Sequence, residues 1–158
     1  MTNNDILKRL RYALNFDNVT MIEMFRLAGV DMTQSRIDAM MKKDEEPGFE
    51  HCPRTLLGSF LDGFIAYRRG PRTEGGSAPK KNLQLTNNVI LRKLKIALEL
   101  RDEDFVEIMT LAGDDVSKSE ISALFQKPDH KNFKECRDQF LRTFIKGLTL
   151  YMKKKDGK

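Results

Sequence analysis

The sequence carries one stretch twice, as TNNDILKRLRYAL at residues 2–14 and as TNNVILRKLKIAL at residues 86–98. A shift of 84 positions extends this match without a gap and aligns residues 2–70 with residues 86–154. Of the 69 aligned pairs, 23 are identical, whereas chance would give about one pair in fifteen. Self-similarity at a fixed period indicates a repeated structural unit. The sequence therefore predicts a tandem duplication of a module of about 70 residues.

Within each copy, apolar residues recur at intervals of three and four, which is typical of amphipathic helices. Each copy has four such segments, and neither copy shows the sustained alternation of a strand. In the first copy the segments are carried by Ile6, Leu7, Leu10, Ala13 and Leu14; by Met21, Ile22, Phe25 and Ala28; by Ile37, Met40 and Met41; and by Leu56, Leu57, Phe60, Leu61, Phe64 and Ile65. The sequence predicts an all-α fold in which two four-helix modules are related by a pseudo-two-fold axis.

These patterns divide the chain into helical repeat 1 (residues 1–69), a linker (70–85), helical repeat 2 (86–152) and a basic tail (153–158). The linker is rich in Gly, Pro and Ser, so we expect it to be flexible and residues 71–82 to be mobile. A module of this size is near the lower limit for an independent core. We therefore expect the two modules to pack against each other.

Gly63 and Gly147 are aligned in the middle of the fourth predicted helix of each copy. A glycine inside a helix costs about 1 kcal/mol relative to alanine. Its presence in both copies predicts that another part of the backbone approaches closely there.

Composition narrows the functional classes. The 158 residues are 40% hydrophobic and 32% charged, with a net charge of +5, and no apolar run approaches the roughly 18 residues of a membrane span. Two cysteines and no secretory signal indicate a reducing, cytoplasmic environment without membrane association. No phosphate-binding glycine loop, nucleophile elbow or carboxylate pair is present. We expect no catalytic residue, no cofactor, no metal and no enzymatic activity.

Cys52 and Cys136 occupy equivalent positions near the start of the fourth helix, where a thiol can be activated. His51 and His130 are not equivalent to each other, so no cysteine–histidine pair recurs. Because free cysteine is usually buried, we favour packing over catalysis or zinc binding at both positions.

Two features of the sequence favour nucleic-acid binding: a likeness to a helix-turn-helix and a basic first helix. The second and third predicted helices of copy two resemble a helix-turn-helix through the spacing of Val116, Ile121 and Leu124, although Asp114 and Asp115 lengthen the turn. Residues 1–69 and 86–152 each have no net charge, which weakens this interpretation. The first helix nevertheless has a basic face in both copies. The candidate nucleic-acid contacts are Lys8, Arg9, Arg11, Arg92, Lys93, Lys95 and Lys118.

The chain also resembles a bacterial family, domain of unknown function 1456. The matching stretches are the Asn-Asn start of both copies, 46–52, 60–64 with 68–70, 128–136 and 138–141, so the resemblance covers essentially the whole chain. It implies a duplicated helical domain of about 70 residues per copy. It implies no activity and no functional residue.

The leading hypothesis from the sequence is a non-enzymatic helical module that binds a protein partner. The alternative is a DNA-binding protein that uses the helix-turn-helix-like pair or the basic face of the first helix. The sequence determines neither the partner nor the oligomeric state.

Overall fold

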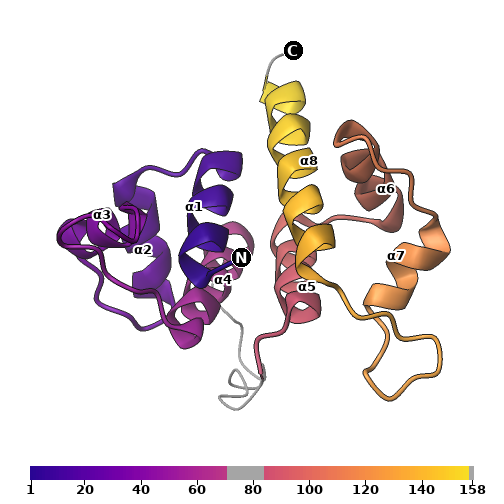
Figure 1. The fold of residues 1–158 in the computed structure, drawn as a ribbon, viewed down its shortest axis with the longest axis horizontal. Helices are drawn as coiled ribbons and strands as arrows, with labels where there is room; N and C mark the ends of the chain where they lie inside the picture. Colours follow the sequence, from indigo (N-terminus) through magenta and orange to yellow (C-terminus); the bar gives the residue numbers. More distant parts are fainter. Residues whose placement is uncertain (71–83, 157–158) are drawn as a thin grey trace.

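The computed structural model describes residues 1–70 and 84–156, and in these ranges the chain forms helices and connecting segments without a strand. Figure 1 shows the first repeat on one side of the molecule and the second repeat on the other. The helices of repeat 1 are α1 (Asn3–Leu14), α2 (Asn18–Leu27), α3 (Gln34–Met41) and α4 (Arg54–Arg69), and those of repeat 2 are α5 (Asn87–Leu98), α6 (Asp102–Leu111), α7 (Lys118–Leu124) and α8 (Asp138–Asp156). The predicted all-α fold is confirmed, and so is the tandem duplication.

Equivalent residues begin and end equivalent helices in the two repeats. Thr2 and Thr86 cap α1 and α5, because each hydroxyl accepts a hydrogen bond from a backbone N–H three residues further on. Gly29 and Gly113 follow α2 and α6 with φ of +81° and +86°. This left-handed conformation suits glycine and closes the helix end through backbone hydrogen bonds.

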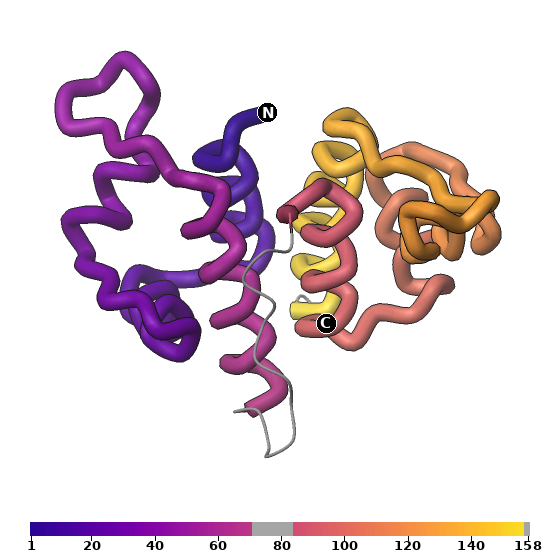
Figure 2. The backbone as a smooth tube through the Cα atoms, turned by 90° about the horizontal axis from the view of Figure 1, so that it is seen from below, coloured from indigo at the N-terminus to yellow at the C-terminus, as the bar shows by residue number. Residues whose placement is uncertain are grey.

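The repeats pack against each other through two equivalent pairs of helices. The first helix of repeat 1, α1, packs on α8, and the first helix of repeat 2, α5, packs on α4. Figure 2 shows α4 and α5 adjacent between the two repeats. The buried side chains of both repeats form one continuous apolar cluster. The two modules therefore share a core, as the small size of each module predicts.

Two segments were predicted to lie outside the helical repeats, the linker at 70–85 and the basic tail at 153–158. The predicted linker at residues 70–85, including the mobile stretch expected at 71–82, falls outside the described residues except for Gly70, Gln84 and Leu85. The predicted basic tail at 153–158 is wrong as a separate segment, because α8 continues to Asp156. Lysines near a helix C-terminus interact favourably with the helix dipole. Lys154 also forms an ion pair with Glu107 at 3.2 Å.

None of the described helices is long and apolar enough to span a lipid bilayer.

A buried asparagine joins the start of α1 to the segment that precedes α4. Asn4 is 1% exposed, and its amide nitrogen donates to the carbonyl oxygens of Met40 and Glu50, both at 3.0 Å. Its side-chain oxygen accepts a hydrogen bond from the backbone N–H of Cys52 at 2.9 Å. One amide thus satisfies three backbone groups that no helix pairs.

The second repeat builds the same clamp. Asn88 donates to the carbonyl oxygens of Leu124 at 2.9 Å and Lys134 at 2.8 Å. Its side-chain oxygen accepts from the N–H of Cys136 at 2.8 Å. The Asn-Asn start of each copy therefore has a structural role: it sets where the fourth helix begins relative to the first.

One ion pair recurs with its signs reversed. In repeat 1, Arg36 of α3 pairs with Glu50 at 2.8 Å. The aligned residues of repeat 2 are Glu120 and Lys134, which pair at 3.4 Å. The contact between the third helix and the segment before the fourth has been kept, although neither residue has.

The two mid-helix glycines lie where backbones meet, as the sequence predicts. A methyl group added to Gly63 of α4 would overlap the carbonyl oxygen of Met24 in α2. A methyl group added to Gly147 of α8 would likewise overlap the carbonyl oxygen of Ile108 in α6. These glycines allow the second and fourth helices of each repeat to pack at short range.

We predict that Gly147→Ala lowers the free energy of unfolding by about 1–3 kcal/mol, because the overlap with Ile108 outweighs the better helix propensity of alanine. Gly58→Ala is the matched control, since Gly58 also lies inside a helix but a methyl there would meet only Leu85, at an ordinary 3.8 Å. That control should be neutral or gain up to about 1 kcal/mol. Urea unfolding measures both, and a higher midpoint for Gly147→Ala would contradict close packing.

We further predict that Asn4→Asp lowers the free energy of unfolding by about 3 kcal/mol at neutral pH, because a carboxylate would face the carbonyl oxygens of Met40 and Glu50. This environment raises the pKa of the introduced carboxyl in the folded state, so stability should recover as the pH falls towards about 4. Asn132→Asp, at an exposed position, is the control. Equal unfolding midpoints for the two variants would show that the clamp contributes little.

Candidate functional site

The basic residues predicted on α1 differ in what holds them. Arg11 donates its Nε–H to the carbonyl oxygen of Phe16 at 3.1 Å, which fixes it against the end of its own helix. Lys8 and Arg9 form no ion pair with any residue in the described ranges. Both border a surface hollow that residues of α8 also line.

The equivalent residues on α5 all have partners within the protein. Arg92 donates to the carbonyl oxygen of Phe125 at 2.8 Å. The ammonium of Lys95 lies 4.4 Å from the centre of the Phe125 ring, a cation–π contact. Lys93 forms an ion pair with Asp62 across the contact between α4 and α5. In repeat 2, the three basic residues of the first helix are therefore all paired with other groups of the protein.

Lys118 is remote from these residues. It is the first residue of α7 and borders a polar hollow of about 710 Å³ together with Asp102, Glu120 and Lys134. The opposite charges around this hollow offset one another, so it presents no basic surface.

The pseudo-two-fold axis creates two equivalent contacts between the repeats, which we name the α4–α5 seam and the α1–α8 seam. The α4–α5 seam is crossed by two ion pairs. One joins Asp62 to Lys93, and the other joins Arg69 to Glu99 at 3.1 Å. Each acidic residue neutralises a basic residue of the other repeat.

The α1–α8 seam lacks both acidic residues. Lys146 stands in place of Asp62 and faces Arg9, the equivalent of Lys93, around one hollow. Asn15 stands in place of Glu99, while Lys153 keeps the positive charge of Arg69. The α4–α5 seam therefore has two ion pairs. The four equivalent positions of the α1–α8 seam hold three basic residues, one asparagine and no acidic residue.

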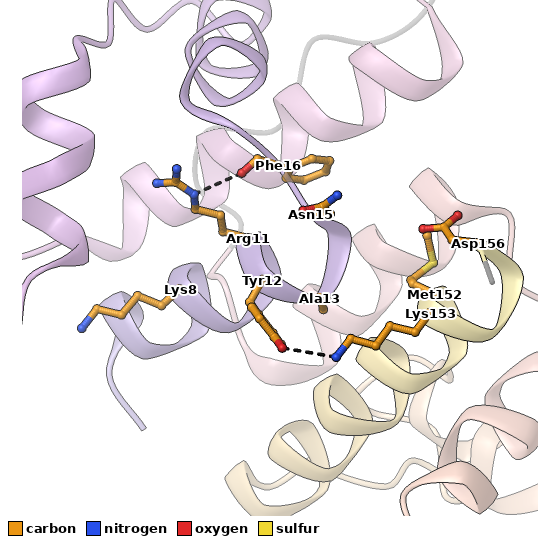
Figure 3. A pocket seen from close by; sticks show the side chains of 9 residues that line it. All are labelled: Lys8, Arg11, Tyr12, Ala13, Asn15, Phe16, Met152, Lys153 and Asp156. Atoms are coloured by element: carbon orange, nitrogen blue, oxygen red, sulfur yellow. Dashed lines mark hydrogen bonds between the residues drawn. The ribbon is translucent and has the colours of Figure 1, made fainter.

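Two hollows lie along the α1–α8 seam. One, of about 370 Å³, is lined by Lys8, Arg9, Tyr12, Ile145, Lys146, Thr149 and Leu150. The other, of about 650 Å³ and shown in Figure 3, is lined by Lys8, Arg11, Tyr12, Ala13, Asn15, Phe16, Met152, Lys153 and Asp156. Lys8 and Tyr12 border both, so the hollows form one continuous surface along α1.

Tyr12 and Lys153 meet across the seam. The Lys153 ammonium donates to the phenol oxygen of Tyr12 at 3.3 Å and lies 5.3 Å from the centre of its ring. Figure 3 shows the two side chains reaching towards each other from α1 and α8. Tyr12 is 67% exposed, and its counterpart on the other seam is Ile96.

Sequence reasoning missed Lys146, Lys153 and Tyr12 as members of this site. A signal was available in the alignment of the two copies, because Lys146 replaces Asp62 and Asn15 replaces Glu99. That signal gains meaning only when it is known that α1 packs on α8 rather than on a helix of its own repeat.

The two cysteines are buried and unsuited to nucleophilic chemistry. Cys52 is fully buried and Cys136 is 3% exposed. Burial raises the thiol pKa of Cys52 to about 11 and that of Cys136 to about 12, and nearby carboxylates act in the same direction. A raised pKa keeps the thiol protonated and unreactive. Among the described residues, no group of three or more His, Cys, Asp or Glu is placed to hold a metal ion.

Comparison with known proteins identifies the family. The family described as a protein of unknown function (DUF1456) matches residues 3–70 and, a second time, residues 87–154. The chain belongs to this family. Its two matches coincide with the two helical repeats, and each runs from the Asn-Asn clamp to the end of the fourth helix or close to it.

One relative is similar to this chain over its full length. The uncharacterized protein YehS of Escherichia coli (strain K12) is 40% identical over 157 residues, which are 99% of this chain and 100% of that protein. No solved structure matches the chain. Neither the family nor this relative points to an enzyme class.

We predict that neither cysteine reacts with iodoacetamide at neutral pH while the protein is folded. With thiol pKa values of about 11 and 12, the thiolate fraction is lower than that of a free thiol by a factor of about 100 or more. In urea both thiols should be labelled promptly, which mass spectrometry of the alkylated protein would show. Rapid labelling of either cysteine in the native protein would revive the catalytic interpretation.

Proposed function

We propose that this protein is a non-enzymatic binding module whose ligand is a nucleic acid, held along the α1–α8 seam. One observation carries the proposal. Where the α4–α5 seam pairs Asp62 with Lys93 and Arg69 with Glu99, the equivalent positions of the α1–α8 seam hold Arg9, Lys146 and Lys153 without an acidic residue.

Electrostatics favours a polyanion at this surface. Arg9 and Lys146 border one hollow, with Lys8 beside them. Asp5, one turn earlier on α1, offsets part of the charge of Lys8 and Arg9, and an anion in the hollow would offset the remainder. The seam runs along two helices, and its cations therefore form a line rather than a point. A line of basic side chains matches the regularly spaced phosphates of a nucleic acid, and release of counterions drives binding.

A protein ligand has less support. Among the described residues, the large apolar side chains that are most exposed are Tyr12, Val19, Tyr67, Ile96 and Leu150. Of these, Tyr12 and Leu150 line a common hollow, and that hollow also holds three cations, whereas the other three lie on helices α2, α4 and α5. A protein-binding surface normally offers a contiguous apolar centre. The hypothesis of a protein partner, which ranked first from the sequence, therefore becomes the alternative.

The helix-turn-helix-like pairs also have less support than the seam. On α7, Lys118 is accompanied by Glu120, and on α3 the guanidinium of Arg36 is occupied by Glu50. Residues 112–117 separate α6 from α7, more than the three or four residues of the usual turn. These helices offer few cations for phosphates.

We predict micromolar binding of a fluorescently labelled oligonucleotide at low salt, which anisotropy would measure. With Lys8, Arg9 and Lys146 each neutralising one phosphate, log K should fall against log salt with a slope of about −2 to −3. The double variant Arg9→Ala, Lys146→Ala should reduce the magnitude of that slope by about 1.5.

The control variant is Lys127→Ala, Lys131→Ala, which removes the same charge from exposed positions between α7 and α8. It should keep the parent slope. Equal weakening by both double variants would show that only net charge matters, and the seam proposal would then be wrong. Absence of binding at low salt, together with a stoichiometric protein that co-purifies with the chain, would favour the alternative.

A further inference from the structure

We infer that the nucleic acid held by the α1–α8 seam is single-stranded and that one of its bases stacks on Tyr12. This inference rests on the proposed function and names the form of the ligand. It depends on features of the seam that phosphate binding alone does not require: an exposed aromatic ring and a hollow of mixed character beside it.

The ring of Tyr12 is available and held in place. It is 67% exposed, so the apolar core does not use it. The ammonium of Lys153 holds its hydroxyl from the opposite helix at 3.3 Å. A ring held in this way loses little conformational freedom when a base stacks on it. Tyr67, which is 47% exposed on α4, lines neither of the seam hollows.

The two hollows beside Tyr12 differ in the group that each can accept. The smaller one combines Lys8, Arg9 and Lys146 with no acidic side chain in its lining, so it suits a phosphate. The larger one has Ala13, Phe16 and Met152 in its lining, together with the cations Lys8, Arg11 and Lys153 and the carboxylate of Asp156. Arg11 and Lys153 already have hydrogen-bond partners in Phe16 and Tyr12, and the carboxylate disfavours a phosphate. The apolar surface and the carboxylate suit a base, whose face is apolar and whose amino groups can donate to a carboxylate.

This arrangement selects against a duplex. In a duplex both faces of each base are covered by neighbouring bases, so Tyr12 would meet only sugar and phosphate. In a single strand a base can turn out and lie against the ring, while the adjoining phosphates stay on Lys8, Arg9 and Lys146. Sequence preference should be weak, because every base has a π-face.

The test compares three labelled probes by anisotropy: a single strand of about twelve nucleotides, the duplex of the same sequence, and an abasic strand of the same length. The parent protein should bind the single strand more tightly than either of the others. Tyr12→Ala should weaken single-strand binding about tenfold and leave duplex and abasic binding unchanged, since stacking on one aromatic side chain contributes this much. Its salt slope should remain that of the parent.

Two further variants separate stacking from other effects. Tyr12→Phe keeps the ring and should bind within about threefold of the parent, although it loses the hydroxyl that Lys153 holds. Tyr67→Ala removes an exposed tyrosine away from the seam and should bind as the parent does. Because the chain has three tyrosines and no tryptophan, quenching of tyrosine emission by the single strand provides a second readout, and Tyr12→Ala should remove most of it.

The outcomes distinguish this inference from the proposed function. If Arg9→Ala, Lys146→Ala loses binding while Tyr12→Ala does not, or if duplex and single strand bind equally, the seam binds nucleic acid but stacking on Tyr12 is wrong. If no probe binds at low salt, both are wrong. If polyglutamate displaces the single strand as effectively as unlabelled strand does, the seam recognises acidic protein segments, and both are likewise overturned.

Discussion

The buried amide of Asn4, with its half-buried equivalent Asn88 in the second repeat, is the interaction on which the rest of the structure depends. Each repeat has to bring its first and fourth helices together, although a long irregular segment separates the third helix from the fourth. That segment leaves backbone groups without helical partners, and one asparagine side chain satisfies three of them. An asparagine is suited to this task because its amide both donates and accepts. The neighbouring Asn3 and Asn87 donate to the carbonyl oxygens of Cys52 and Cys136, which strengthens the same junction.

The clamp has a consequence beyond its own repeat. The first and fourth helices of each repeat are joined at one end, so together they form one surface. The two repeats pack on each other through these surfaces, with α1 on α8 and α4 on α5. A two-fold arrangement makes both contacts from the same surface patches. In a duplicated chain, however, the two copies can change independently. The charges at equivalent positions of the two seams differ accordingly: they are basic on the α1–α8 seam and paired on the α4–α5 seam.

The charge difference between the seams contrasts with another ion pair, in which a change of sign at one residue is matched by a change of sign at its partner. Arg36 and Glu50 became Glu120 and Lys134 in the other copy, so the ion pair persists with exchanged signs. At the seams no such exchange occurred: the position of Asp62 is occupied by Lys146 while its partner position keeps a positive charge in Arg9. Like charges brought together cost stability, and Asp5 offsets only part of the charge of Lys8 and Arg9. This arrangement of charges is the feature on which we base the proposed ligand-binding role of the α1–α8 seam.

The sequence by itself determined the duplication, the helical character of both copies and the close approach at Gly63 and Gly147. All of these depend on local spacing or on the identity of aligned residues, which a single chain displays directly. The tertiary structure alone decided which of the predicted basic residues contact other groups of the protein and which form no ion pair within the described residues. Lys93 and Arg9 are equivalent in sequence, and each lies on the first helix of its repeat. They differ because the partner of each comes from the fourth helix of the other repeat, Asp62 for one and Lys146 for the other. Helical periodicity is a property of neighbouring residues, whereas an ion pair between repeats depends on how the helices pack, and no local pattern contains that information.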